Sequence, residues 1–462
     1  PINTLHRLLD RKRTKIVATL GPASSEPDKL DQLVAAGVDV FRLNLSHGDS
    51  RGHEALYHQV RKASSRAGRA VGILADLPGP KIRVGRLQGG SITLTEGEEV
   101  TVTTRDIVGG PGLIPSQYQA LTQDVSAGNM MLLDDGNLEL EIMTVSGTEV
   151  RCRVLVGGVL KDKKGMNLPG VKVTAPSLTE NDQSLARFAL DLGVDFLALS
   201  FVRRPSDIQA LREVMATAAN SALLIAKIEK AEALVEIEGI IREADGIMVA
   251  RGDLGVELRP EKVPAIQAQL VEMARDFDKP VIVATQMMES MITNPSPTRA
   301  EANDVANAVL DGADTVMLSG ETSVGKYPVL TISHMQKVID STETEDSMFH
   351  KWHRPTEDCP TFLADSICYN AVRLAEQVNA SAIVTLTHSG YTALKISSHR
   401  PRAPIFSFTM NKEIISRLSL VWGVRAYFFG KCQNINDYTE YTEDFLIGAN
   451  FLKKGDLVVH VG

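Results

Sequence analysis

The amino-acid sequence predicts an α/β protein built on a TIM (β/α)8 barrel, with a β-barrel-like lid domain inserted after the third barrel strand and a C-terminal open α/β domain. Three observations lead to this prediction. Eight short apolar runs recur along the chain, and each is followed by apolar residues at helical spacing. A segment of alternating runs rich in Val and Thr interrupts them, and further strand and helix patterns follow them. At 462 residues, the chain is long enough for two or three domains.

The barrel is predicted from three strand–helix units before the interruption and five after it. Its strand runs are residues 14–20, 38–43, 71–77, 195–201, 222–228, 245–250, 280–285 and 314–319. A doubly wound open sheet is the alternative for repeated units of this kind, but eight units of regular length favour closure. The predicted barrel domain covers residues 1–78 and 176–340. Within it, we expect Met287, Met288 and Met291 to pack the core from a helix after the seventh strand.

The interruption is predicted to be the lid domain, residues 79–175. Gly-Gly, Asp-Gly and Ser-Gly pairs separate alternating runs such as residues 91–96 and 99–104. A domain inserted after a barrel strand lies on the active face, so we expect it to cover the site. The C-terminal domain is predicted at residues 341–462, where a polar, acidic linker gives way to alternating helix and strand patterns.

Composition narrows the function classes. The chain is 44% hydrophobic and 23% charged, with a net charge of −8 and no basic block, which argues against nucleic acid and membrane as partners. The apolar run at residues 16–20 is too short for a signal-peptide core or a membrane span. The cysteines lie far apart in the sequence, so we do not expect a disulfide framework. We expect the protein to be located in a reducing cytoplasm. They are Cys152, Cys359, Cys368 and Cys432.

The most informative stretch joins the fifth and sixth strands through a predicted helix at residues 230–244. The fifth strand ends in Lys227-Ile228-Glu229, and alternation places Lys227 and Glu229 on the same face. Asp253 follows the next strand, so these groups are predicted to meet at the carboxyl ends of neighbouring strands. Two carboxylates suit Mg²⁺, which needs few protein ligands beside substrate phosphates. A surface Lys–Glu salt bridge is the simpler alternative.

The other strand ends add cations and hydroxyl groups. They are Arg42, Asn44, Leu45, Ser46 and His47 after strand 2, Asp76, Lys81 and Arg83 after strand 3, Thr285 after strand 7 and Ser319 after strand 8. A mouth with these groups suits a phosphorylated substrate. Residues 320–326 match the spacing of a P-loop, but Tyr327 stands where the Mg²⁺-binding hydroxyl is required, so that motif is set aside.

Several longer motifs resemble the pyruvate kinase family. They are TKIVATLGPAS, VFRLNLSHG, LADLPGPKIR, KKGMNLPG, AKIEKAEA, MVARGDLGVE, ATQMMESM, PTRAEANDVANAVLDGADTVMLSGETSVGKYP and, in the C-terminal domain, APIFSFT. The resemblance covers all three predicted domains in the family's order. It implies Mg²⁺- or Mn²⁺-dependent phosphoryl transfer from phosphoenolpyruvate to ADP, giving pyruvate and ATP, in a cytoplasmic homotetramer.

The resemblance also implies roles at matching positions. The expected catalytic residues are Lys227, Arg42, Thr285 and Ser319. The expected phosphoenolpyruvate-binding residues are Arg42, Lys227, Gly252, Asp253 and Thr285, and the expected metal ligands are Glu229 and Asp253. The nucleotide is expected to face Asn44, Leu45, Ser46, His47, Arg83 and, from the lid, Lys164.

One departure from the family concerns a monovalent cation. Many members hold K⁺ at positions that match Asn44, Ser46, Asp76 and Leu77, with a Glu nearby. Here Lys81 stands in place of that Glu. An ammonium repels K⁺ and offers a replacement charge, so we expect the enzyme to act without K⁺.

A second departure concerns regulation. The resemblance places a phosphorylated effector at the loop Thr387, His388, Ser389, Gly390, Tyr391 and Thr392. Hydroxyl groups and Gly before a helix form a phosphate site, although an ordinary Ser-Gly turn has the same composition. Relatives that bind a sugar bisphosphate carry basic residues at positions 388 and 391. We therefore expect an effector with a single phosphate.

Two other function classes fit parts of the sequence. A metal-dependent aldolase or lyase on the same barrel would use Lys227 as a Schiff-base nucleophile. A catalytically inactive sensor would only bind a sugar phosphate. The lid and the two arginines disfavour the first class, and the intact Lys227, Glu229 and Asp253 disfavour the second.

Overall fold

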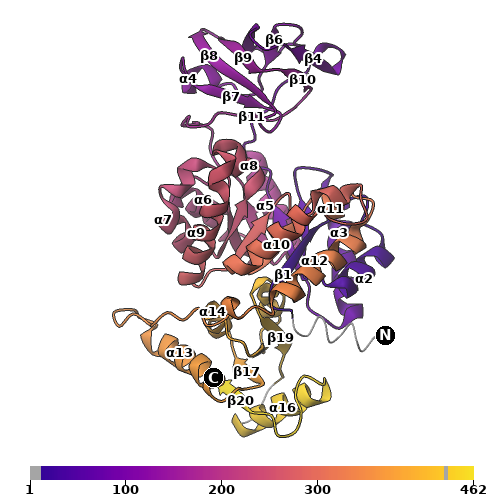
Figure 1. Cartoon of the computed structure of the whole chain (residues 1–462), viewed down its shortest axis with the longest axis vertical. Helices are drawn as coiled ribbons and strands as arrows, with labels where there is room; N and C mark the ends of the chain where they lie inside the picture. The colour runs from indigo at the N-terminus through magenta and orange to yellow at the C-terminus, as the bar shows by residue number, and fades with distance from the viewer. Residues whose placement is uncertain (1–11, 431–434) are drawn as a thin grey trace.

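The computed structural model describes residues 12–430 and 435–462, and its three parts are stacked with the barrel in the middle (Figure 1). Eight parallel strands form a closed barrel in the order β1-β16-β15-β14-β13-β12-β3-β2. They are β1 Lys15–Thr19, β2 Val40–Asn44, β3 Gly72–Asp76, β12 Phe196–Leu199, β13 Leu223–Ile228, β14 Gly246–Ala250, β15 Val281–Ala284 and β16 Thr315–Leu318. The pairing of β1 with β16 closes the ring, which confirms the predicted barrel and excludes the open sheet.

The barrel strands form because their residues are buried on both faces, as expected for a parallel sheet covered by helices. The surrounding helices are α2 Pro27–Ala36, α3 Ser50–Ala67, α5 Glu180–Leu192, α6 Pro205–Met215, α7 Ile237–Glu243, α9 Val263–Asp276, α10 Arg299–Asp311 and α12 Pro328–Thr342. Capping boxes at Thr179 and Thr298 begin α5 and α10. Each fully buried Val, Leu or Ile contributes roughly 1.5–3 kcal/mol, so the shared core dominates the stability of the ring.

Two predicted helices differ from the structure. Residues 230–244 form a 3-10 helix η2, Ala231–Leu234, and then the short α7, where Gly239 allows close approach to Pro205 of α6. After β15, the three methionines are buried as predicted, but they lie on and before a 3-10 helix η4, Glu289–Ile292, because prolines at 295 and 297 prevent a continuous helix.

The strands of the lid lie between β3 and β12 in the chain. One sheet has the order β11-β7-β8-β9-β5-β6, and β10 pairs with β4. The elements are β4 Ser91–Leu94, β5 Glu99–Thr103, β6 Leu113–Pro115, α4 Leu121–Asp124, β7 Met130–Leu133, β8 Leu138–Ser146, β9 Glu149–Val156, β10 Gly158–Lys161 and β11 Met166–Asn167. Alternate residues of these strands bury a separate core, so the lid packs as a body of its own.

The C-terminal part is an open parallel sheet in the order β19-β18-β17-β20, as predicted. Its elements are α13 Phe362–Gln377, β17 Ala382–Leu386, α14 Tyr391–Ser398, β18 Ile405–Thr409, α15 Lys412–Arg417, β19 Val424–Phe428, α16 Ile435–Gly448 and β20 Val458–Val461. The strand order reverses between β17 and β20, which makes that point the expected ligand crevice of this sheet. Leu420 and Trp422, just before β19, join the barrel core and anchor the sheet to the barrel.

The described cysteines Cys152, Cys359 and Cys368 are free, and Cys432 lies outside the described residues. Within residues 12–430 and 435–462, we find no helix with the length and apolar character of a membrane span.

Candidate active site

A buried carboxylate lies at the centre of the barrel mouth. Asp76 ends β3 and is 1% exposed. Its Oδ2 accepts a 2.7 Å hydrogen bond from Nε of Arg42, and its Oδ1 lies 3.1 Å from Nζ of Lys227. Burial opposes ionisation of Asp76, but the charges of Lys227 and Arg42 outweigh it and lower the pKa of the carboxyl below its ordinary value. Asp76 is therefore an anion that holds two cations in place.

The Lys227 ammonium has further partners. Its Nζ donates to Oγ of Ser200 at 2.8 Å and lies 3.1 Å from Oε1 of Glu229. Burial alone would lower the pKa of Lys227, but Asp76 and Glu229 outweigh it and raise the pKa above its ordinary value. A charged ammonium can stabilise developing negative charge, whereas a Schiff-base nucleophile has to be a neutral amine. This pairing argues against the aldolase class.

The guanidinium of Arg42 is fixed from the first three strands. Arg42 lies on β2, its NH2 lies 2.7 Å from Asp76 on β3, and its NH1 donates to Oγ1 of Thr19, which ends β1, at 3.1 Å. Oγ1 of Thr19 in turn donates to the Leu318 carbonyl on β16 at 2.9 Å. Arg42 is thus a rigid donor fork of the kind that binds phosphoryl oxygens.

The predicted metal carboxylates follow neighbouring strands, because β13 pairs with β14: Glu229 comes directly after β13, and Asp253 is in the first turn of the helix after β14. Glu229 is 2% exposed, and its Oε2 accepts a 2.7 Å hydrogen bond from the amide of Phe201. Burial raises the pKa of the Glu229 carboxyl; Lys227 opposes the rise, and Asp253 and Asp76 add to it. A cation strongly stabilises the ionised form of a buried carboxyl that has other negative charges beside it. The hard oxygen atoms of a carboxylate are suitable ligands for Mg²⁺.

Among residues 12–430 and 435–462, no three His, Cys, Asp or Glu side chains cluster so as to bind a metal alone. Two carboxylates with open positions for substrate and water are the donor set that Mg²⁺ commonly uses beside phosphates. The residues therefore fit a cation that is completed by the substrate.

Thr285 is held in a strained conformation directly after β15. Its φ is 74°, a value that a β-branched residue rarely adopts. Its Oγ1 accepts a 2.7 Å hydrogen bond from the amide of Gly252, the second residue of helix α8, Arg251–Glu257. Arg251 donates to the Thr285 carbonyl at 2.6 Å and pairs with Asp304 at the same distance. Strain that is held in this way is typical of functional sites.

Ser319 begins the turn after β16, which continues into the short helix α11, Gly320–Ser323. A buried carboxylate organises this turn, because Glu321 accepts from the amide of Ser319 at 2.7 Å and from that of Met288 at 3.2 Å. Burial raises the pKa of the Glu321 carboxyl, and these amide donors oppose the rise. Glu321 therefore joins the loops after β15 and β16, where Thr285 and Ser319 lie.

The expected nucleotide residues lie on the loop after β2 and on the lid connection. Asn44 accepts from the amide of Ser46 at 3.2 Å, Leu45 is buried, and His47 is exposed. Arg83 donates to the Lys163 carbonyl at 3.1 Å. Lys164 forms a 2.6 Å ion pair with Asp134, in the turn between β7 and β8. The structure thus brings Arg83 and the Lys163–Lys164 turn together.

Lys81 forms ion pairs with one carboxylate of the barrel and one of the lid. The carboxylates within 4 Å of its Nζ are those of Asp253, at 3.5 Å, and Asp135 of the lid, at 3.8 Å. The oxygens of Asp76 instead bind Arg42 and Lys227. Lys81 therefore adds positive charge beside Asp253, the predicted metal ligand, and it joins the lid to the barrel.

A pocket between lid and barrel is lined by Lys81, Asp253 and Phe201 together with Met166 and Asn167 of the lid strand β11. Lys230 also lines it and forms a 2.6 Å ion pair with Glu257 of helix α8, to which Asn167 donates at 3.4 Å. The lid thus contacts the barrel beside the metal carboxylates.

Sequence reasoning missed several residues that support the site. Thr19 and Ser200 both lie at the carboxyl ends of barrel strands, so the rule that identified Arg42 and Lys227 could also have identified them. Arg251 directly follows β14, so the same rule reaches it, but no local pattern gives its partners, which come from β15 and α10.

Comparison with known protein families assigns the chain to one of them. The family model "Pyruvate kinase, barrel domain" matches residues 11–332, and "Pyruvate kinase, alpha/beta domain" matches residues 365–462. The chain belongs to the pyruvate kinase family. As a member of the pyruvate kinase family, it is a phosphotransferase of glycolysis.

Individual relatives agree with this assignment. A pyruvate kinase of Mycobacterium tuberculosis (strain CDC 1551 / Oshkosh) is 45% identical over 450 residues, which cover 97% of this chain and 94% of that protein. One from Geobacillus stearothermophilus is 44% identical over 456 residues, 97% of this chain and 77% of that protein. A crystal structure of a pyruvate kinase from Cryptosporidium parvum superposes with a TM-score of 0.93 at 35% identity and covers 98% of this chain and 94% of that one.

The shared carboxylate gives the first prediction. Asp76→Asn removes the charge that holds Arg42 and Lys227, so we expect turnover to fall by about 100-fold, the effect of losing one electrostatic element of an active site. Steady-state kinetics checks this result. Asp39→Asn is the matched control, because Asp39 is also buried and pairs with Lys12 (2.5 Å) and Arg69 (3.1 Å), but at the opposite end of the barrel. Equal losses of turnover in both variants would contradict a specific role for Asp76.

Proposed function

We propose that the enzyme transfers the phosphoryl group of phosphoenolpyruvate to ADP, giving pyruvate and ATP, with Mg²⁺ or Mn²⁺ as its divalent cofactor. The observation that supports this most is the pair of buried cations, Arg42 and Lys227, held by Asp76 beside Glu229. Arg42 grips the phosphoryl group. Lys227 stabilises that group during transfer and the enolate that remains, because its charge is desolvated and preorganised.

The remaining residues position the reactants. Gly252 and Thr285 line the phosphoenolpyruvate pocket, where the Gly252 amide and the Thr285 hydroxyl already bind each other. Thr285 and Ser319 lie on the side where the enolate takes up a proton. ADP binds along Asn44, Leu45, Ser46, His47, Arg83 and Lys164.

Glu229 and Asp253 hold the divalent cation. When bound, the cation supplies Lewis-acid neutralisation of the phosphoryl and carboxylate oxygens. Lys81, 3.5 Å from Asp253, limits the negative charge of this site before substrate arrives.

The test is pyruvate formation from phosphoenolpyruvate and ADP, followed by coupled reduction with lactate dehydrogenase. We expect turnover that requires both substrates. Pyruvate released from an aldol substrate, with covalent trapping of Lys227 by borohydride, would instead establish the aldolase or lyase class. Binding of a sugar phosphate without any turnover would establish the sensor class.

The metal site gives the second prediction. Glu229→Gln and Asp253→Asn each remove a ligand charge, so we expect each to raise the Mg²⁺ concentration needed for half-maximal activity by at least about tenfold. Activity measured across a Mg²⁺ titration checks this result. Glu232→Gln, at the rim of the same pocket, is the control. Wild-type Mg²⁺ dependence in both ligand variants would refute the assignment.

Independence of K⁺ is the next part of the proposal. The oxygens of Asp76 bind Arg42 and Lys227, and the Leu77 carbonyl accepts from Ser200 at 2.7 Å, so both groups already have partners. Lys81 adds a positive charge at the mouth. Repulsion between two positive charges disfavours a weakly bound cation, and it weakens in inverse proportion to the distance between them.

The third prediction follows from this charge. The unmodified enzyme is expected to keep its turnover in tetramethylammonium buffer without KCl, and Lys81→Glu to gain activation by KCl. Lys62→Glu, an exposed charge reversal on α3, controls for net charge. Strong stimulation of the unmodified enzyme by KCl would rule out the idea.

Activation by a singly phosphorylated metabolite is a further part of the proposal. The loop at 387–392 follows β17, beside the point where the strand order reverses. Thr387 accepts from the amide of Gly390 at 2.9 Å, and His388 and Ser389 are exposed before helix α14. Hydroxyl groups and amides at this helix start suit one phosphate.

The fourth prediction tests that loop. Thr387→Ala combined with Ser389→Ala removes two hydroxyl groups, so we expect activation by glucose 6-phosphate, ribose 5-phosphate or AMP to be lost while the unactivated rate is kept. Initial rates with and without each compound give the answer. Undiminished activation in this variant would move the effector site elsewhere.

Assembly into a homotetramer is the last part of the proposal. Helix α13 exposes a single apolar stripe of Leu363, Ile367, Leu374 and Val378, and Leu363 is 75% exposed. Such stripes are typical of protein–protein contacts.

The fifth prediction concerns this stripe. Leu363→Asp with Ile367→Asp is expected to give a smaller assembly in sedimentation velocity, because two charges would be buried in the contact. Val159→Asp, on an exposed residue of the lid, is the control. An unchanged sedimentation coefficient would show that α13 is not an interface.

A further inference from the structure

A buried ionic network crosses the boundary between the barrel and the C-terminal sheet. Lys395 of helix α14 is 7% exposed. Its Nζ donates to Oδ2 of Asp278 in the barrel at 2.7 Å and lies 3.5 Å from Oδ2 of Asp365 in helix α13. One ammonium therefore serves two carboxylates that belong to different parts of the molecule.

The second carboxylate is bound to the loop at 387–392. Oδ1 of Asp365 accepts a short hydrogen bond from the hydroxyl of Tyr391, and its Oδ2 accepts from Thr361 at 3.0 Å. Tyr391 is the first residue of helix α14 and belongs to the proposed effector loop. A change in this loop therefore acts on Asp365 directly.

The first carboxylate lies at the start of a catalytic strand. Asp278 has a φ of 55° in the turn between α9 and β15, and the strand that follows ends next to Thr285. Asp278 is itself held by Lys395, and its pKa is lowered: burial opposes ionisation, but His353, whose Nε2 lies 3.7 Å from Oδ1 of Asp278, and Lys395 outweigh it. The turn that begins β15 is thus tied to helix α14.

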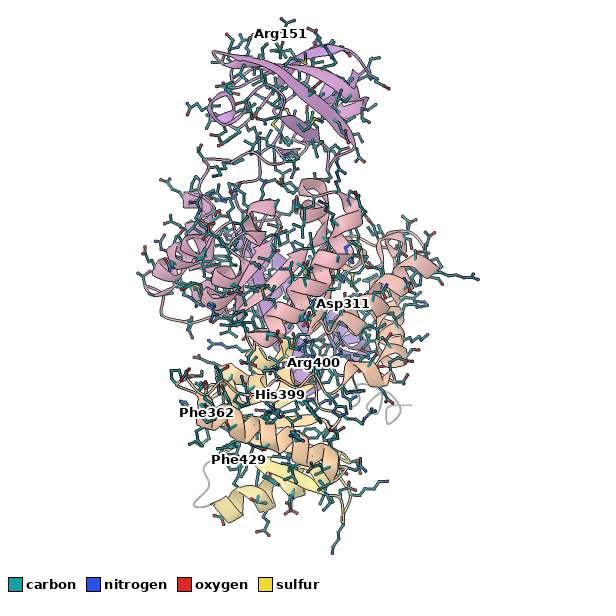
Figure 2. The ribbon with its side chains drawn as sticks, turned by 60° about the vertical axis from the view of Figure 1, so that its left-hand side comes forward. Arg151, Asp311, Phe362, His399, Arg400 and Phe429 are labelled. Carbon is teal, nitrogen blue, oxygen red and sulfur yellow. The ribbon has the colours of Figure 1, made fainter. Side chains whose placement is uncertain are left out.

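Aromatic rings lie beside the network. The ring of His399 is buried and packs against that of His353 at a tilt of 34°, with centroids 4.4 Å apart, and Tyr369 meets His399 edge-on. Burial, with the charge of His353, lowers the pKa of His399 to about 3, so this ring is neutral near pH 7. Figure 2 shows His399 and Arg400 at the boundary between the barrel and the C-terminal sheet.

We propose that Lys395 couples the effector loop to the barrel, because Asp365 and Asp278 compete for its ammonium. While Tyr391 and Thr361 satisfy Asp365, Lys395 pairs more closely with Asp278. Movement of Tyr391 with the loop leaves Asp365 short of a donor, which draws Lys395 away from Asp278 and loosens the turn that begins β15. A buried carboxylate without a hydrogen-bond or ionic partner raises the free energy of the folded state. The ammonium of Lys395 therefore moves toward whichever carboxylate has fewer other donors. The direction of this coupling rests on the effector site proposed above, but the network itself does not require an effector to be tested.

The experiment is hydrogen–deuterium exchange of the full-length enzyme with the variant Tyr391→Phe. This change deletes one hydroxyl in the C-terminal sheet, yet we expect amides at residues 279–285 of the barrel to exchange about fivefold faster or more, the lower end of typical coupling between sites. Tyr441→Phe, on helix α16 of the same C-terminal domain, is the matched control and is expected to leave amide exchange at residues 279–285 unchanged. Unchanged exchange at residues 279–285 in Tyr391→Phe would overturn the proposal.

A second variant separates coupling from a general loss of packing. Lys395→Met removes the shared cation, so we expect Tyr391→Phe to have no additional effect on residues 279–285 when the two changes are combined. Additive effects would mean that Tyr391 acts on the barrel by another route, and would overturn the role of Lys395.

The same variants distinguish failure of the coupling from failure of the effector site. If glucose 6-phosphate and AMP neither bind nor activate the unmodified enzyme, the effector site fails, while faster exchange in Tyr391→Phe still supports the coupling. If either compound activates the unmodified enzyme, Lys395→Met is expected to bind it and show no activation. Full activation of Lys395→Met would overturn the coupling.

Discussion

The buried carboxylate of Asp76 is the constraint on which the mouth of the barrel depends. Two cations, Arg42 and Lys227, lie within hydrogen-bonding distance of it, and two buried charges of the same sign need an anionic partner between them. Because Asp76 pairs with both of them, the two cations are already fixed at the mouth of the barrel, where we propose that phosphoryl charge develops. Preorganisation of this kind lowers the cost of reorganisation during the reaction.

Closure of the barrel makes this arrangement possible. The carboxyl ends of β1, β2, β3 and β13 have to converge before Thr19, Arg42, Asp76 and Lys227 can meet, and the ring brings them there. The lid and the C-terminal sheet lie at opposite ends of the barrel (Figure 1). The lid reaches Asp253, the proposed metal ligand, through Lys81, and the C-terminal sheet reaches the turn before β15 through Lys395. Both contacts therefore join outer domains to strands that carry site residues.

The sequence predicted much of this arrangement because barrel chemistry lies at strand ends. Alternation along one strand placed Lys227 beside Glu229, and the following unit placed Asp253 nearby, as the pairing of β13 with β14 confirms. The sequence did not predict that Asp76 is the shared partner of Arg42 and Lys227, because β3 and β13 are separated by β12 in the ring. The sequence also predicted no partners for Lys81, since Asp135 comes from a lid whose position no local pattern determines.

The central claim is that Lys227 stabilises the phosphoryl group during its transfer and contributes little to the affinity for phosphoenolpyruvate. The most direct measurement compares the turnover of Lys227→Met with its dissociation constant for phosphoenolpyruvate in the presence of Mg²⁺. The account predicts that turnover falls by at least about 100-fold while the dissociation constant changes only a few-fold, because the charge of Lys227 matters most in the transition state. Weaker binding with unchanged turnover would contradict it.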